Sequence, residues 1–199
     1  MMSMVFWRNT LIEAMRELSL NVLDIAQNSI SAGASLVTLR VEEDSAADRI
    51  VIEIEDNGCG MTLEQIKQVR DPFYTTRTTR KVGMGVPLFR MAAEMAGGGL
   101  DIRSRPGTGT VVTASFVRSH IDRMPLGDMC ATVSALIRLN PDIDFCYRHT
   151  IDGRSFQVDT RELRSILGDV PLNAPEVMEW IDGYLREQMD SILAGDVDI

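Results

Sequence analysis

The sequence predicts an α+β fold, a two-layer sandwich in which a mixed, mostly antiparallel sheet is covered by helices on one face. A long run of apolar residues at helical spacing, short alternating segments in hairpin pairs, and glycine-rich breaks between them predict this class. A chain of 199 residues can bury one core, or one core with a small second lobe.

Composition and charge indicate which kinds of protein and partner are expected. With 45% hydrophobic and 25% charged residues, the chain is typical of a soluble, folded protein. Its net charge of −9 is spread along the sequence, which disfavours nucleic acid as a partner. The three cysteines form no CxxC pair, so we expect no disulfide framework, no zinc site and a cytoplasmic location. The N-terminal apolar run is broken by polar residues, so we expect neither a signal peptide nor a membrane span.

The first half begins with an amphipathic helix from Met15 to Ser31. Two alternating segments follow, Leu36 to Val41 and Ile50 to Ile54, joined by the polar stretch EEDSAAD, and they indicate an antiparallel pair of strands. Thr62, with Gln65 three residues later, resembles a capping box and predicts a short helix after the turn DNGCGM.

Residues 70 to 83 hold two basic clusters, several threonines and a proline without apolar periodicity, so we expect a long functional loop, named here the lid. The stretch VPLFRMAAEMA predicts a helix that ends at the glycines 97 to 99. Two strands then follow, Leu100 to Ser104 and Thr110 to Val117, with RPGTG as their hairpin turn.

Beyond Val117 a second set of predicted helices and strands begins. A hairpin is indicated at Asp152-Gly153, a helix capped by Asp159 or Thr160 follows it, and Pro175 begins a helix that runs to about Ile192. We therefore expect two parts, residues 1–118 as the first domain and residues 119–199 as a small C-terminal α+β lobe of unknown role.

Residues that could carry chemistry lie on the first helix and at the turns. The P-loop pattern GxxxxGK[ST] is absent, and none of the three GxG pairs continues as GxGxxG. Asp24 and Asn28 are four residues apart, so their side chains share one face of the helix. A carboxamide oxygen suits Mg²⁺, and a carboxylate can act as a base. A solvated polar face and ordinary turn glycines are the structural alternatives.

Four motifs resemble one superfamily, that of DNA gyrase, the ninety-kilodalton heat-shock chaperone, histidine kinases and MutL. DIAQNSISAGAS resembles its N-box, and EDNGCGM resembles the MutL form of its first glycine box. DPFYTTR followed by GMGVPLF resembles the histidine-kinase lid and second glycine box, and SRPGTGTVVTASF resembles the closing segment. The motifs follow family order over residues 15 to 118. The resemblance implies the Bergerat ATP-binding fold, with ATP and Mg²⁺ as cofactors.

The resemblance also implies roles for individual residues. Asp56 would accept the adenine amino group, Asn28 would hold magnesium, and Asp24 would act as the catalytic base. Free N–H groups at a helix start would favour phosphate, and loop cations would neutralise it. The predicted ATP-binding residues are Asn28, Asp56, Gly58, Gly60, Met61, Thr76, Arg77, Lys81, Gly83, Met84, Gly85, Val86 and Thr110.

Two features depart from the kinase pattern. Pro87 stands where the second glycine box usually has a third glycine, although proline is accepted in the first turn of a helix. About 14 residues precede the helix that carries the first motif, so no helical hairpin with a phosphoaccepting histidine is expected in this sequence. His120 and His149 follow the ATP-binding domain and are interpreted as structural.

Two functional hypotheses remain. The first is an enzyme that hydrolyses ATP or transfers its terminal phosphate to a partner protein, as the stand-alone anti-sigma-factor kinases of this superfamily do. The second is a module whose protein interactions are gated by ATP or ADP, with little or no turnover. Asp24 favours the enzyme, because binding alone needs no base. No membrane or nucleic-acid partner is expected, and a homodimer is compatible with the sequence.

Overall fold

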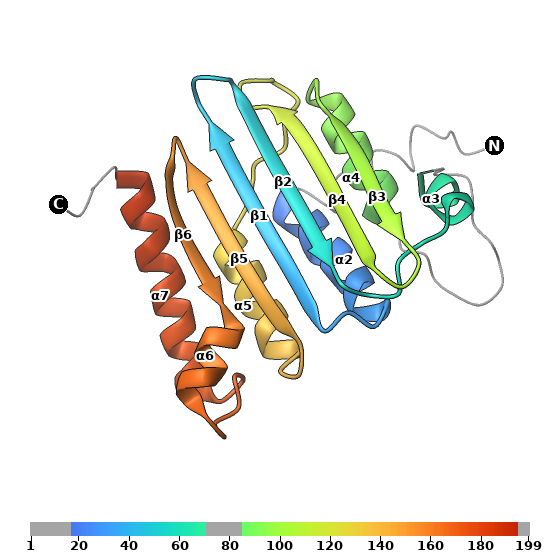
Figure 1. Cartoon of the computed structure of the whole chain (residues 1–199). Helices are drawn as coiled ribbons and strands as arrows, with labels where there is room; N and C mark the ends of the chain where they lie inside the picture. The colour runs from blue at the N-terminus through green and yellow to red at the C-terminus, as the bar shows by residue number, and fades with distance from the viewer. Residues whose placement is uncertain (1–16, 71–84, 195–199) are drawn as a thin grey trace, which may run out of the picture.

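The computed structural model describes residues 17–70 and 85–194, which form six strands and six helices. All six strands belong to one sheet in the order β3-β4-β2-β1-β5-β6 (Figure 1). The β1–β5 pair is parallel and the other four pairs are antiparallel, so the mixed, mostly antiparallel sheet is confirmed. The strands are β1 (Leu36–Asp44), β2 (Arg49–Asp56), β3 (Gly99–Arg105), β4 (Gly109–Val117), β5 (Asp144–Ile151) and β6 (Arg154–Asp159). The helices are α2 (Leu18–Ser31), α3 (Leu63–Arg70), α4 (Gly85–Met95), α5 (Met129–Leu139), α6 (Thr160–Leu167) and α7 (Pro175–Ala194).

The core lies between the sheet and the row of helices α4, α2, α5 and α7. Alternate residues of each strand point into it, as the period-two patterns of β1 and β2 require. In β2 these are Ile50, Ile52 and Ile54, each 1% exposed. The opposite face is polar: the guanidinium of Arg40 on β1 pairs with the carboxylates of Glu53 and Glu55 on β2 at 2.6 and 2.8 Å. The strands are thus apolar on the helix-covered face and polar on the other.

Local sequence signals set several element ends. The capping box is present, since the Thr62 N–H donates to Gln65 Oε1 at 2.8 Å and the Gln65 N–H donates to Thr62 Oγ1 at 3.3 Å. Asp152 and Gly153 both have positive φ, 49° and 83°, as a type I′ hairpin turn requires. The Asp159 carboxylate caps α6 by accepting from the Arg161 N–H.

The C-terminal residues extend the same sheet. Strand β5 pairs in parallel with β1, and helix α5 packs against α2 and α7, so one hydrophobic cluster runs across residue 118. The second edge of β1 is thus the place where the later strands join the sheet, and the boundary at residue 118 stays a prediction. The sequence analysis did not predict α5, which is capped by the Asp128 carboxylate.

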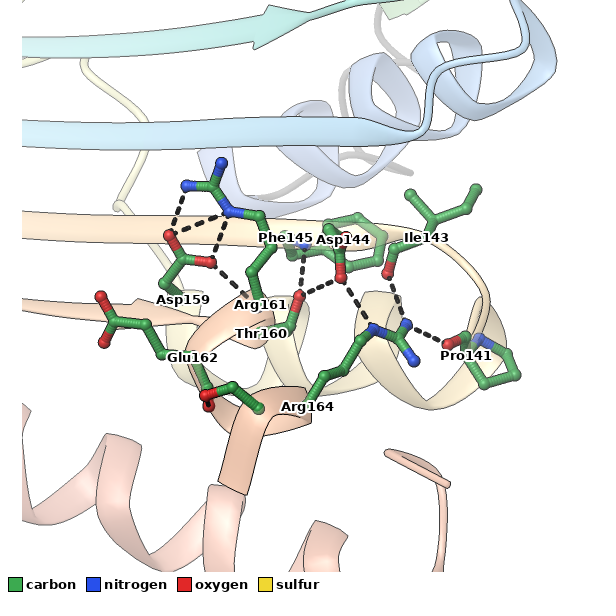
Figure 2. A network of polar contacts seen from close by, with 10 residues as sticks. Pro141, Ile143, Asp144, Phe145, Asp159, Thr160, Arg161, Glu162 and Arg164 are labelled. Carbon is green, nitrogen blue, oxygen red and sulfur yellow. Dashed lines mark hydrogen bonds and ion pairs between the residues drawn. The ribbon is translucent and has the colours of Figure 1, made fainter. Parts of the chain in front are cut away.

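A polar network fixes the start of β5 against α6 (Figure 2). Arg164 donates to the Asp144 carboxylate at 2.8 Å and to the Pro141 carbonyl, and Thr160 Oγ1 accepts from the Phe145 N–H at 2.8 Å. The Asp144 N–H in turn donates to the Ser35 carbonyl just before β1, at 2.9 Å. This end of the sheet is where β1 begins and β2 ends, so the network lies at the end that carries Asp56.

Among the described helices, none combines the length and the hydropathy that a membrane span requires.

Candidate functional site

A row of polar side chains crosses three strands at one end of the sheet. The cross-strand neighbours Ile54, Val112 and Ile102 are buried in the core, and the next neighbours on the same face are Asp56, Thr110 and Ser104. Directly opposed residues share a face of the sheet, so these three side chains point toward the helix layer at its edge. The apolar core therefore ends in a row of two hydroxyls and an acid, with Thr110 between Ser104 and Asp56.

Two donors hold the Asp56 carboxylate. Ser29 Oγ on α2 donates to Oδ2 at 2.7 Å, and the Gly58 N–H donates to Oδ1 at 2.9 Å. Ser29 is only 4% exposed, so the orientation of the carboxylate is fixed from the interior. Each carboxylate oxygen can accept a further hydrogen bond. The acid is thus oriented and still able to accept from a ligand.

Glycines let the two turns around Asp56 approach each other. A Cβ at Gly60, where φ is +65°, would lie 1.9 Å from the Arg105 carbonyl oxygen. A Cβ at Gly109, where φ is +121°, would lie 1.9 Å from the Asp56 carbonyl oxygen. Both turns therefore require glycine on two grounds, conformation and space.

Asn57 ties the turn after Asp56 to the start of β1. Its Oδ1 accepts from the backbone N–H groups of Ser35 and Leu36, at 2.9 and 3.0 Å, and its Nδ2 donates to Ser35 Oγ at 2.9 Å. The Asn57 N–H also donates to the Leu36 carbonyl at 3.4 Å, so the turn that follows Asp56 is held against the start of β1.

Asp24 and Asn28 lie one turn apart on α2, and both are partly buried. Asn28 directly precedes Ser29, the residue that contacts Asp56, and Asp24 lies about 6 Å further along the helix axis at 1.5 Å per residue. The Gly85 N–H, at the first residue of α4, donates to the Asp24 carboxylate. A Cβ at Gly85 would lie 1.7 Å from Asp24 Oδ2, so glycine permits this close contact.

Burial raises the pKa of Asp24 above its ordinary value of 3.8, although the hydrogen bond from Gly85 opposes the shift. A carboxyl with a raised pKa is a better proton acceptor once it is ionised. The positive end of the α4 dipole lies at the same place, although the Gly85 N–H already donates to Asp24 and Pro87 has no N–H. The Asp24 carboxylate therefore lies against the N-terminal end of α4.

A pocket of about 540 Å³ opens at the polar row. Its walls are the ends of β2, β3 and β4 and one side of α3, including Asp56, Ser104, Thr110, Ile102 and Ile66. Of the other predicted residues, Gly58 and Val86 are buried, and Met61 packs against the core. Thr76, Arg77, Lys81, Gly83 and Met84 lie outside the described residues, as does the predicted lid after Arg70, the last residue of α3.

Comparison with known proteins assigns the family. Residues 8–120 match the family model described as histidine kinase-, DNA gyrase B-, and HSP90-like ATPase. The chain belongs to this ATPase family. The match covers the α2 face, the Asp56 turn and the β3–β4 hairpin, so the geometry above belongs to the family's domain.

The curated relatives are mainly sensor kinases. The chain is 34% identical over 95 residues to the sensor protein DegM of Bacillus sp. (strain B21-2), a match that covers 48% of the chain and 25% of that protein. It is 33% identical over 102 residues to the signal transduction histidine-protein kinase AtoS of Escherichia coli (strain K12), covering 51% of the chain and 16% of the kinase. The matched region thus spans a quarter or less of these relatives.

A solved structure shares the fold. The N-terminal domain of a DNA repair protein superposes with a TM-score of 0.52 at 15% identity, covering 81% of this chain and 60% of that one. Because 81% exceeds the part matched by the family model, the likeness also includes residues beyond 120.

Three residues of this ATPase-family site were missed by the sequence analysis. Ser29 orients Asp56, Asn57 anchors the turn, and Ser104 contacts both turns. Asn57 had a signal, since it lies inside the motif EDNGCGM. Ser29 and Ser104 also lie inside motifs, DIAQNSISAGAS and SRPGTGTVVTASF, but their partners come from other elements, so the motifs alone did not show these contacts.

Proposed function

We propose that the chain binds ATP with magnesium in the pocket at Asp56 and hydrolyses it or transfers its terminal phosphate to a partner protein. The observation that carries this proposal is the Asp56 carboxylate, oriented by Ser29 and Gly58 with lone pairs left to accept. Membership of the ATPase family supports it independently.

Asp56 supplies selectivity for adenine in this proposal. An ionised carboxylate only accepts hydrogen bonds, so it pairs with the exocyclic amine of adenine and repels the carbonyl oxygen that guanine carries at the same position. The apolar side chains Ile66 and Ile102 line the same pocket and supply surface for the flat faces of a base.

The residues on α2 fit a magnesium ion that arrives with a nucleotide. Within the described ranges, no three His, Cys, Asp or Glu side chains gather to hold a metal ion by themselves. Magnesium in nucleotide sites takes one or two protein oxygens, with phosphates and waters supplying the rest. The Asn28 carboxamide oxygen is the protein ligand in this proposal. Magnesium, when bound, neutralises the charge on the phosphate oxygens.

Asp24 acts as the general base. It accepts a proton from water or from a hydroxyl of a partner protein as that oxygen attacks the terminal phosphorus, while the positive end of the α4 dipole attracts the phosphate oxygens. The hydrogen bond from Gly85 holds the carboxylate beside that helix end. The relatives' names as sensor kinases support transfer to protein, and the matched region is a small part of them.

Incubation with terminally labelled ATP and magnesium separates the outcomes. Free phosphate indicates an ATPase, and stable label on an added protein indicates a kinase. The proposal predicts one or the other at saturating ATP. ATP binding without either product, with a cell extract as the source of acceptors, contradicts turnover and favours a nucleotide-gated interaction module.

A further inference from the structure

Ser104 on β3 joins three parts of the pocket through one hydroxyl. The Met61 N–H donates to Ser104 Oγ at 2.8 Å, Ser104 Oγ donates to the Gly109 carbonyl at 2.8 Å, and Thr110 Oγ1 lies 2.9 Å away. Ser104 and Thr110 are cross-strand neighbours, as are Thr110 and Asp56, so the hydroxyls and the acid stand in one row. No predicted role involves Ser104.

The directions of these hydrogen bonds follow from the proton count. A hydroxyl has one proton and two lone pairs. The Met61 N–H can only donate and the Gly109 carbonyl can only accept, so Ser104 gives its proton to Gly109 and receives one from Met61. Ser104 Oγ then has one lone pair left and no proton. The contact with Thr110 is therefore a hydrogen bond only if Thr110 donates its proton to that lone pair.

Thr110 is then left with lone pairs only on its side toward the pocket. Asp56 is also an acceptor there, because its carboxylate has no proton to give when ionised. The row therefore presents an acid and a hydroxyl that both accept, and a ligand or bridging water must donate to both. An amino group has two N–H bonds and can donate to both acceptors. A 6-oxo group would instead place its own lone pairs against those of Asp56 and Thr110.

We propose that Ser104 is a specificity-determining positioning residue, which fixes the Thr110 hydroxyl as an acceptor so that the pocket selects a 6-amino purine over a 6-oxo purine. This rests on the proposed function, since it concerns the base of the nucleotide bound at Asp56. Ser104 acts through Thr110 and through the Met61 backbone, and it need not touch the base.

Ser104→Ala frees the Thr110 hydroxyl to rotate and to donate to a 6-oxo group. Affinities for ATP and for inosine triphosphate, whose base carries a 6-oxo group, are measured by calorimetry on the full chain. The ratio of the two dissociation constants is the readout, because general destabilisation weakens both nucleotides alike. We expect Ser104→Ala to lower this preference for ATP by about ten-fold, the value of one hydrogen bond gained or lost.

The matched control is Ser115→Ala, which removes another hydroxyl from the β3–β4 ladder. Ser115 Oγ donates to the Gly99 carbonyl at 3.4 Å, near the other end of these strands. Its loss is expected to leave the preference unchanged. Ser104→Thr retains the hydroxyl and is expected to restore the preference.

A second route tests the mechanism if Ser104→Ala folds poorly. Thr110→Val removes the hydroxyl that Ser104 is proposed to orient, so this single variant should lower the preference for ATP over inosine triphosphate. The double variant Thr110→Val with Ser104→Ala should show the same preference as Thr110→Val. An unchanged preference in folded Ser104→Ala, or a full additional loss in the double variant, overturns the role of Ser104 and leaves the proposed function standing. Failure of the wild-type protein to bind ATP overturns both.

Discussion

Replacing Asp56 by Asn tests the adenine assignment with little change of shape. The carboxylate accepts from Ser29 Oγ at 2.7 Å and from the Gly58 N–H at 2.9 Å. An amide cannot place its NH₂ group against the Gly58 N–H, since donor would meet donor. Its oxygen therefore faces Gly58 and its nitrogen faces Ser29. The Ser29 hydroxyl can turn to accept, with its proton directed to the Ile25 carbonyl 3.4 Å away. The fold is expected to survive.

Binding is expected to weaken because the substitution removes a charged acceptor and leaves an NH₂ donor beside the adenine amine. A hydrogen bond to a charged group contributes about 1.5 to 3 kcal/mol, and an unmatched donor costs about 1 to 3 kcal/mol. A combined loss of about 3 kcal/mol corresponds to a roughly 100-fold weaker affinity for ATP.

Calorimetric titration with ATP measures this loss, and a thermal melt confirms that the variant is folded. Asp101→Asn is the matched control, since it removes the same charge from the exposed face of the neighbouring strand β3. It should change the affinity by no more than about two-fold. Wild-type affinity in a folded Asp56→Asn protein would refute the reasoning about the carboxylate.

Four further predictions concern the phosphate side and the turns. Asp24→Ala should lower turnover by about 100-fold or more at saturating ATP while the dissociation constant stays near that of the wild type, and unchanged nonzero turnover would remove Asp24 as the base. Asn28→Ala should abolish the tightening of nucleotide binding by magnesium, so equal magnesium dependence in the variant and the wild type contradicts the ligand role. Because the pKa of Asp24 is raised and only the ionised form is a base, turnover should rise with pH through a midpoint above 3.8, and Asp24→Asn should lose this limb; a wild-type midpoint at or below 3.8 speaks against the base. Gly109→Ala should lower the free energy of unfolding by about 2 kcal/mol or more, since its Cβ would meet the Asp56 carbonyl. Gly107→Ala, where φ is also positive and nothing lies within 4 Å, should cost only about 1 kcal/mol, and equal denaturation midpoints for the two would contradict the steric argument.

Features written in short stretches of sequence were predicted well. The capping box at Thr62, the hairpin turn at Asp152-Gly153 and the helix start at Pro175 are local, and all three are present. Each depends on the conformational preference of a few consecutive residues, so the sequence contains the needed information.

Features that depend on distant partners were not predicted. The parallel pairing of β5 with β1 joins segments that are far apart in the chain. The residue pattern of each strand shows which face is buried but does not indicate which strand lies beside it. Helix α5 did have a signal, a capping Asp128 followed by apolar residues at helical spacing. At the site, motifs singled out Asp24, Asn28 and Asp56, whose roles stay predictions, whereas the hydrogen bond from Ser29 to Asp56 joins α2 to β2 and no motif shows it.

Calorimetric titration of the wild-type chain with ATP, with and without magnesium and beside GTP, tests the central claim most directly. The proposed site predicts saturable binding of one ATP per chain, tightened by magnesium, and GTP binding at least about 100-fold weaker, because the carbonyl of guanine faces the carboxylate of Asp56. No saturable binding of ATP, or equal affinity for ATP and GTP, would contradict an adenine-nucleotide site at Asp56.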